Sequence, residues 1–333
     1  MRTIRGGTLV CVLGALAVCS FAGEPSLRAR WVMPPRCTPF APVRVQDLKE
    51  ELRQTGYRLV IGIHPEHRGA GQKDYPPRDL FVVNADGTGL KRLTDTTDKD
   101  EHVPRTSPDG KWFTFNYGDY LVDVATLAIP SKPIWAGYTW TPDSKRTIHC
   151  GKRGLVYTDV RTGEASEPVA VQRRVSVVDL SQDGKWVIFE IRNFRGSKYT
   201  IDFMSVAGGE IHKMPNHPKG GGECHPHFSP DGRWMCWNAG GSLAIRRFDP
   251  SVPDGTDGKI VTLPREALGQ DPCGRWSHCG RYIAYVRIPH KGSWKVHSPI
   301  CIVRVADGAT VTVSPPGWLG HHWDYDWLPP ADE

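Results

Sequence analysis

A short turn followed by an apolar strand recurs along the chain, and this repeat restricts the fold more than any other feature. The clearest copy is Ser229-Pro-Asp-Gly-Arg-Trp234, where proline presets one turn position, aspartate bonds to nearby backbone and glycine accepts a positive φ. Counting from the first residue of each turn, which we call the anchor, the copies begin at Ser107, Thr141, Ser181, Ser229, Ser277 and, in degenerate form, Leu328. The steps are 34, 40, 48, 48 and 51 residues. Repeats of this length with several short strands are typical of β-propeller blades.

The repeats predict an all-β fold, a six-bladed β-propeller over residues 58–330. After a first partial blade at 58–95, the others run from about 103–133, 138–168, 175–215, 225–264 and 276–315. The first segment resembles a blade that lacks its innermost strand, and the tail 321–329 resembles an innermost strand with nothing after it. We expect the N- and C-terminal segments to pair, which closes the ring and hides both edges. A ring of seven blades is the alternative if residues 64–78 or the N-terminal arm contribute another blade.

The N-terminus predicts export. Arg2 and Arg5 precede an apolar run from Leu9 to Ala22 that ends on small residues, which is the pattern of a signal peptide over residues 1–22. The run is too short to span a bilayer, and we see no second such segment. A lipid anchor at Cys19 is the less favoured alternative. Residues 23–57 then form an arm and a short helix over 47–57, so we expect a periplasmic or secreted protein, monomeric and without a membrane span.

Charge and cysteine content restrict the partners. Removing residues 1–22, which hold two arginines and no acid, changes the net charge from +6 to +4. The basic residues are scattered among acids, so we do not expect nucleic acid as a partner. Seven cysteines remain, an odd number, with no CxxC pair. Cys224 and Cys273 fall at neighbouring rim positions of adjacent predicted blades. This proximity could reflect a disulfide or arise by chance, and the sequence does not decide between the two.

The turn units at Ser229–Trp234 and Ser107–Trp112, together with the stretch Phe81–Thr94, resemble the TolB-like propeller repeat family. The resemblance implies the fold over about 58–330 and says little about activity, because this repeat serves unrelated functions. TolB itself has an α/β domain before its propeller, and residues 23–57 are too short for one. More distant relatives are oligogalacturonate lyases, whose propellers carry histidine-bound metal, and prolyl-oligopeptidase-like peptidases. The peptidases need a Gly-x-Ser-x-Gly nucleophile elbow, which this sequence lacks.

Aligning the repeats by their anchors predicts which residues share one rim of the central channel. Two positions before the anchor stand Arg105, Thr139, Asp179, His227, Arg275 and Asp326. Polar residues at this and neighbouring positions come mainly from the first, second, fifth and sixth blades. The candidate ligand-binding residues at the rim are Glu101, His102, Arg105, Glu223, His225, His227, Arg275, His322 and Asp324.

Two functions of different classes remain open. The first is a binding module that holds a protein or glycan at the channel rim. The second is a metal-dependent, carbohydrate-active enzyme, a lyase of acidic polysaccharides. There His225, His227 and His322 would bind a divalent metal, and Arg105 or Arg275 would pair with the substrate carboxylate. A water-filled channel lined by polar side chains would give the same pattern without metal, so no catalytic residue can be named.

The tryptophans fall into two groups according to their position in the repeat. Trp112, Trp186 and Trp234 follow the turn at equivalent places, so we expect them to pack between blades. Trp135, Trp318 and Trp323 lie in predicted loops and are the better candidates for stacking on a sugar ring.

Overall fold

The computed structural model describes residues 45–63, 77–96, 99–130, 137, 139–151, 154–169, 175–192, 199–214, 223–239, 242–252, 261–262, 273–287, 299–314 and 324–330. The chain divides into two units, residues 1–30 and 31–333, and every described residue belongs to the second. The predicted signal peptide and most of the arm therefore lie outside the described residues. None of the helices in the described part is long and apolar enough to cross a membrane.

The described strands form six antiparallel sheets, which we number in chain order. Sheet 1 consists of β22 (Tyr325–Leu328), β1 (Arg58–Ile63), β2 (Asp79–Asn84) and β3 (Lys91–Arg92), and sheet 2 of β4 (Arg105–Thr106), β5 (Trp112–Phe115) and β6 (Tyr120–Asp123). Sheet 3 consists of β7 (Thr139–Trp140), β8 (Arg146–Gly151) and β9 (Gly154–Asp159), and sheet 4 of β10 (Val175–Leu180), β11 (Trp186–Arg192), β12 (Tyr199–Ser205) and β13 (His212–Lys213). Sheet 5 consists of β14 (Glu223–Phe228), β15 (Trp234–Ala239), β16 (Ser242–Arg247) and β17 (Val261–Thr262), and sheet 6 of β18 (Arg275–Trp276), β19 (Tyr282–Val286), β20 (Ile300–Arg304) and β21 (Thr310–Thr312). The all-β prediction is confirmed.

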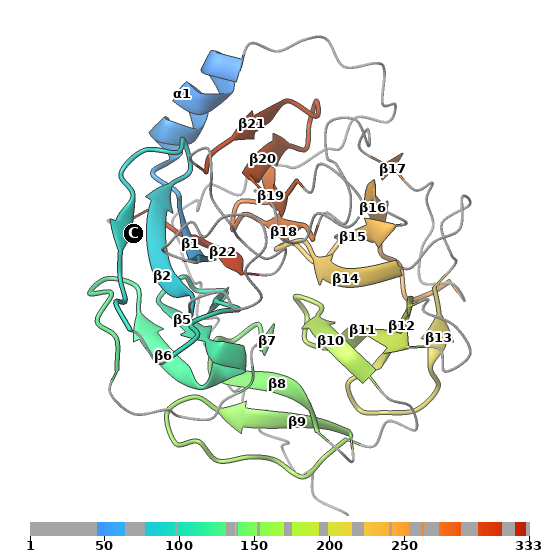
Figure 1. The fold of residues 1–333 in the computed structure, drawn as a ribbon. Helices are drawn as coiled ribbons and strands as arrows, with labels where there is room; N and C mark the ends of the chain where they lie inside the picture. The colour runs from blue at the N-terminus through green and yellow to red at the C-terminus, as the bar shows by residue number, and fades with distance from the viewer. Residues whose placement is uncertain are drawn as a thin grey trace, which may run out of the picture. The chain divides into compact units, whose positions relative to one another are not determined.

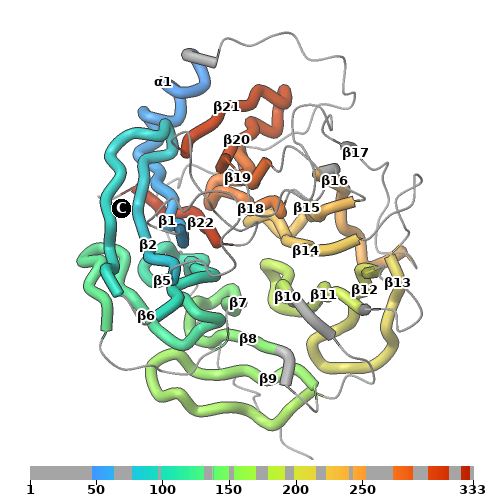
Figure 2. The backbone as a smooth tube through the Cα atoms, in the orientation of Figure 1, coloured from blue at the N-terminus to red at the C-terminus, as the bar shows by residue number. Residues whose placement is uncertain are grey.

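Strands from the two ends of the chain share sheet 1. Strand β22 pairs antiparallel with β1, with Tyr325 opposite Ile61 and Leu328 opposite Arg58, and the two lie side by side in Figure 1. The first strands of neighbouring sheets contact each other in the series β22, β4, β7, β10, β14, β18 and again β22. Figure 2 shows the backbone passing from sheet to sheet in chain order.

The apolar core lies between the sheets. Six clusters of buried side chains each join two neighbouring sheets, in the order 1–2, 2–3, 3–4, 4–5, 5–6 and 6–1. In the cluster between sheets 5 and 6, for example, Leu243 and Ile245 pack with Ile283 and Tyr285. Each sheet therefore buries both faces, which a single sheet of three or four strands cannot do alone.

The tryptophans that follow the turns contribute to this packing. Trp112, Trp186 and Trp234 pack against the clusters between sheets 2 and 3, 4 and 5, and 5 and 6, respectively. The prediction that they pack between sheets is confirmed.

Helix α1 (Val45–Thr55) covers the edge where sheets 1 and 6 meet. Leu48 and Leu52 lie one helical turn apart and are fully buried in the cluster between these sheets. Gly56 follows with φ +67°, the left-handed conformation that favours glycine after a helix. The predicted helix at 47–57 is thus confirmed, with its ends two residues earlier.

Candidate functional site

The repeated turn joins the first and second strands of sheets 2 to 6. In sheet 2 the Ser107 hydroxyl donates to Asp109 Oδ1 (2.6 Å) and accepts from the Trp112 N–H (3.0 Å). The same bonds recur in sheets 3, 4 and 5. In sheet 6 Cys279 replaces the aspartate, and its Sγ lies 3.4 Å from the Ser277 hydroxyl oxygen. The residues just before each anchor are therefore held in equivalent positions.

Two residues before each anchor lies a set of side chains that we call the entry layer. Its members are Arg105, Thr139, Asp179, His227, Arg275 and Asp326. Three tryptophan indoles tie this layer together by donating across sheets. The bonds run from Trp140 Nε1 to the Arg105 carbonyl (2.9 Å), from Trp276 Nε1 to the His227 carbonyl (3.3 Å) and from Trp327 Nε1 to the Arg275 carbonyl (2.8 Å).

Aspartates in the layer make the equivalent link with their side chains. Asp179 Oδ2 accepts from the Phe228 N–H of the next sheet (2.8 Å), and Asp326 Oδ2 accepts from the Thr106 N–H of the next sheet (2.8 Å). Each carboxylate also accepts from the N–H of the residue that follows it (2.9 Å in both cases). The polar atoms of the layer thus hold neighbouring sheets in register.

One corner of the entry layer brings together three ionisable side chains from sheets 4, 5 and 6. Arg275 Nη1 donates to His227 Nδ1 at 2.8 Å, and Asp179 Oδ2 lies 3.4 Å from the same nitrogen. Because Nδ1 accepts from a guanidinium, the proton of the neutral imidazole resides on Nε2. His227 and Arg275 are 6 % and 8 % exposed, so these two side chains are almost completely shielded from solvent.

Burial decides the charge states in this corner. It holds the pKa of His227 well below its ordinary value, and the positive charges of Arg275 and Arg105 add to the effect. It also raises the pKa of Asp179 to about 6, although the Phe228 N–H and the Arg275 charge act in the opposite direction. His227 is therefore neutral and Asp179 titrates near pH 6.

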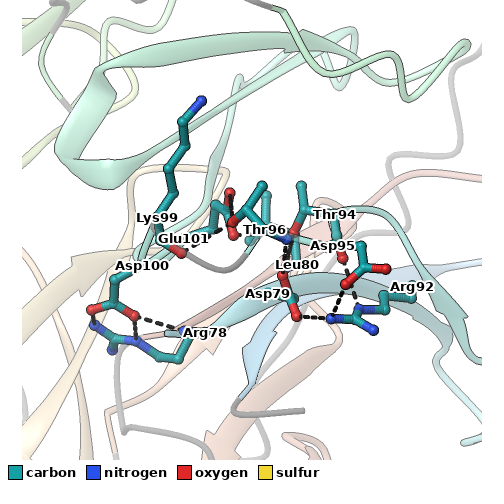
Figure 3. A network of polar contacts seen from close by, with 10 residues as sticks. All are labelled: Arg78, Asp79, Leu80, Arg92, Thr94, Asp95, Thr96, Lys99, Asp100 and Glu101. Atoms are coloured by element: carbon teal, nitrogen blue, oxygen red, sulfur yellow. Dashed lines mark hydrogen bonds and ion pairs between the residues drawn. The ribbon is translucent and has the colours of Figure 1, made fainter. Parts of the chain in front are cut away.

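A second polar network surrounds the entry to sheet 2. The Nε and Nη2 of Arg78 donate to the two oxygens of Asp100 (2.7 and 2.6 Å), and its Nη1 donates to Asp324 Oδ2. Figure 3 shows the Arg78–Asp100 pair from close by. Asp324 Oδ1 accepts from the N–H of Val103 (3.0 Å), a residue with φ +50°. The two carboxylates hold the pKa of Arg78 above its ordinary value despite burial. Asp324 thus joins sheets 1 and 2.

An exposed aromatic side chain projects beside this network. Tyr117 lies in the connection between β5 and β6, in the turn η1 (Asn116–Gly118), and is 52 % exposed. Asn116 and Tyr117 both adopt left-handed backbone conformations, with φ +53° and +59°. The Tyr117 ring meets His102 edge to face, with ring centroids 4.9 Å apart. Partial burial and the Asp324 carboxylate raise the pKa of Tyr117. His102 Nδ1 lies 2.6 Å from the carbonyl oxygen of Asp100, so the Tyr117–His102 pair lies beside the Arg78 network.

Two predicted rim residues, Glu101 and Glu223, are buried and hydrogen-bonded. Glu101 accepts from the Thr96 and Thr94 hydroxyls (2.8 and 3.2 Å), and burial raises its pKa (Figure 3). Glu223 accepts from the indole N–H of Trp237. Both carboxyl groups are buried and tie local structure together.

His225 belongs to a group of potential metal ligands that differs from the predicted one. Its imidazole, the Cys224 thiol and the Glu190 carboxylate each offer a ligand atom, and these atoms lie within 4.8 Å of one another. Glu190 Oε1 also accepts from the His225 N–H and lies 3.8 Å from His225 Nδ1. His225 has φ +56° and lies at a bulge in the pairing of β14 with β15. Its side chain therefore does not follow the alternation of the strand. His227 is not a member of this group.

Some predictions lie outside the described residues. His322 is one of them, so the expected metal set of His225, His227 and His322 stays a prediction. Trp135, Trp318 and Trp323 are others. Cys224 and Cys273 are both described, and the disulfide considered between them is absent.

Sequence reasoning missed several residues of the site. Asp179 stands in the aligned layer, but its blade is not among those that supply most of the polar residues. Glu190 and Tyr117 were not singled out, and for Tyr117 the Asn-Tyr-Gly turn was an available signal. Nothing in the sequence indicated that Arg78 and Asp100 would pair.

Comparisons with known proteins were made for sequence and structure. No family model matches the chain. An uncharacterized peptidase, YuxL, of Bacillus subtilis is 30 % identical over 172 residues, which is 45 % of this chain and 22 % of the relative. Dipeptidyl-peptidase 5 of Porphyromonas gingivalis is 23 % identical over 264 residues, 72 % of this chain and 37 % of the relative. The chain therefore spans much less than half the length of these two curated relatives.

Solved structures show the fold. TolB from Acinetobacter baumannii matches with a TM-score of 0.60 at 17 % identity, over 82 % of this chain and 66 % of that chain. The fold is a β-propeller, and the resemblance to TolB-like propellers is confirmed. Oligogalacturonate lyases also match, with TM-scores of 0.45 and 0.46, and a likeness that weak carries no weight for activity.

Proposed function

We propose that this chain is an exported, six-bladed β-propeller that binds a protein or glycan at the rim of its central channel. Six described sheets, the pairing of β22 with β1 and the six intervening apolar clusters support the blade count and the closure. The basic start and short apolar run of residues 1–22 support export.

The observation that carries the binding role is Tyr117. Within the described part of the chain, the large apolar side chains that are exposed are Tyr117 and Leu90. Tyr117 is held by a left-handed backbone turn and by His102, beside the Arg78–Asp100–Asp324 network. Unusual backbone conformations persist where the surroundings fix them, and such positions concentrate at binding sites. A rigid aromatic ring beside fixed charges loses little entropy on binding, which favours contact with a sugar ring or a peptide.

The rim can be tested with a matched pair of variants. The wild-type chain, Tyr117→Ala and Leu90→Ala would be screened on glycan arrays and against purified envelope proteins. Leu90 is 41 % exposed but lies at the β2–β3 end of sheet 1, so it controls for general loss of apolar surface. We expect binding that Tyr117→Ala weakens at least tenfold and Leu90→Ala leaves unchanged. Equal binding by wild type and Tyr117→Ala would contradict a role for the rim.

The alternative is a metal-dependent, carbohydrate-active enzyme, and the group of Glu190, Cys224 and His225 favours it. A thiolate, an imidazole and a carboxylate together suit zinc, which commonly takes three protein ligands and a water molecule at catalytic sites. Against this, Glu190 already accepts the His225 N–H, so its carboxylate has a structural role.

Elemental analysis of the purified protein decides this alternative. Stoichiometric zinc or manganese that is lost in Cys224→Ser, but kept in Cys279→Ser, would support it. Cys279 is a matched control because it is also a half-buried free thiol. Protein without bound metal after dialysis against zinc would exclude the metal-dependent enzyme.

A further inference from the structure

The turn of sheet 6 makes a contact that reaches past sheet 1. Between sheets 2 and 3, neighbouring turns are joined by a bond from the Asp109 N–H to the Ser144 hydroxyl (3.0 Å). Strands β22 and β1 of sheet 1 are not joined by a turn, because they come from opposite ends of the chain. His278, in the turn between β18 and β19, reaches sheet 2, where its Nε2 lies 3.4 Å from the Ser107 carbonyl oxygen.

The imidazole of His278 is also linked to both strands of that terminal pair. It stacks on Tyr57, which directly precedes β1, with ring centroids 6.3 Å apart and 12° between the ring planes. The Tyr57 ring meets Trp327 of β22 edge to face, with centroids 5.7 Å apart. His278 therefore joins sheet 6 to sheet 2 and, through Tyr57, to the strand pair that closes sheet 1.

These contacts set the protonation state of the imidazole. A carbonyl oxygen only accepts hydrogen bonds, so the proton of the neutral His278 resides on Nε2. Its Nδ1 is enclosed and has no hydrogen-bond partner among the described residues. The residue as a whole is only partly buried, so protons can reach it. Protonation would place a charged N–H at a point that offers no acceptor, which costs free energy.

Two carboxylates face His278 from the neighbouring elements. They belong to Asp326 on β22 and to Asp109 in the turn between β4 and β5. Both carboxylates already accept from backbone N–H groups, and neither forms an ion pair with the imidazole. Burial lowers the pKa of His278, although the two negative charges act in the opposite direction.

The direction of the pH effect follows from this balance. In a locally open form, in which β22 separates from the sheet 6 turn, the imidazole meets water and binds a proton at its ordinary pKa of 6.5. The closed form binds that proton only at lower pH. The contribution of His278 to closure is therefore complete above pH 6.5 and is lost as the pH falls below that value.

We propose that His278 is an acid-sensitive clasp, which holds β22 in place while the imidazole is neutral and loosens it when the imidazole is protonated. The same segment includes Asp324, whose carboxylate joins sheets 1 and 2 and holds Arg78. Acid would therefore loosen the rim as well, and only this last step rests on the proposed function.

Hydrogen–deuterium exchange of the full chain, followed by mass spectrometry, tests the clasp. Protection of β22 would be measured at about pH 5 and about pH 7.5 and corrected for the intrinsic exchange rate at each pH. In the wild type we expect β22 to lose at least about threefold more protection at the lower pH than β12 of sheet 4 loses. His278→Gln keeps an N–H donor for the Ser107 carbonyl but does not titrate, so this extra loss should disappear.

His212→Gln is the matched control. His212 also stacks on an aromatic ring, Phe203, with centroids 4.9 Å apart, but it lies on the outer strand β13 of sheet 4. This variant should lose protection in β22 as the wild type does. Equal losses in β12 and β22 of the wild type, or an extra loss that persists in His278→Gln, would overturn the proposal.

NMR of ¹⁵N-labelled wild-type protein gives a second readout, which holds even if His278→Gln does not fold. We expect the His278 proton on Nε2 at about pH 7.5, and protonation of the ring over the same pH range in which β22 loses protection. A proton on Nδ1, or protonation that leaves β22 unchanged, would contradict the clasp. Neither measurement needs a ligand, so failure of the clasp is distinguished from failure of the rim, which the Tyr117→Ala comparison tests.

Discussion

Replacing Asp179 with asparagine should change how stability depends on pH. The asparagine has nearly the same shape, and its side-chain oxygen can still accept the Phe228 N–H that links sheets 4 and 5. What it removes is a carboxyl group whose pKa burial raises from 3.8 to about 6. A raised pKa favours the folded state below pH 3.8, and this contribution is lost as the pH rises through about 6.

The size of the effect follows from the pKa. At about 1.4 kcal/mol per pH unit, a rise from 3.8 to about 6 corresponds to about 3 kcal/mol. The Asp179 side chain is 22 % exposed, and solvent reduces the effect somewhat, so we expect about 2 to 3 kcal/mol. The free energy of unfolding of Asp179→Asn, relative to wild type, should therefore increase by this amount between about pH 4 and about pH 7.5.

Urea denaturation across this range measures the difference directly. His227, whose low pKa costs stability as the pH falls below its ordinary value, is present in both proteins and largely cancels. Asp326→Asn replaces the equivalent acceptor in sheet 1 and reports the cost of the substitution itself. If the stability difference between Asp179→Asn and wild type stays constant with pH, the assignment of a raised pKa to Asp179 is wrong.

Three further substitutions test how the sheets are joined, each by urea denaturation at neutral pH. Trp327→Phe removes the indole bond to the Arg275 carbonyl and leaves a small cavity, so it should cost about 2 to 3 kcal/mol; a cost below about 0.5 kcal/mol would show that the bond is unimportant. Cys279→Asp restores the turn chemistry found in sheets 2 to 5 and should stabilise by about 0.5 to 1 kcal/mol, whereas destabilisation would show that sheet 6 requires the thiol. Gly110→Ala combines φ +71° with a Cβ that would lie 2.7 Å from Pro329 Cγ, so it should cost about 1 to 3 kcal/mol; an unchanged midpoint would contradict the close packing of this turn.

The sequence predicted the framework because turn chemistry is local. Proline, aspartate and glycine restrict the backbone through their immediate neighbours, so the anchors correctly located the turns that join the first and second strands of sheets 2 to 6. Counting back two residues from the anchor also identified the entry layer, including Arg105, His227 and Arg275. Within a regular strand, equal spacing means equal direction.

Two to four residues further from the anchor, the strand period no longer determines the direction of the side chains. Val103 and His225 have positive φ, and a bulge interrupts the pairing of β14 with β15, so side chains there do not follow the strand period. Glu101 and Glu223 are buried and accept hydrogen bonds from Thr96 and Trp237, which the alignment of the repeats did not indicate. The pairing of Arg78 with Asp100 and Asp324 depends on contacts between sheets 1 and 2, which no local pattern encodes.

The claim that the channel rim forms a binding site is tested most directly by comparing the affinities of the wild-type protein and the Tyr117→Ala variant for a ligand found in the glycan or envelope-protein screen. The account predicts that the variant binds at least tenfold more weakly. Equal affinities of the two proteins would contradict it.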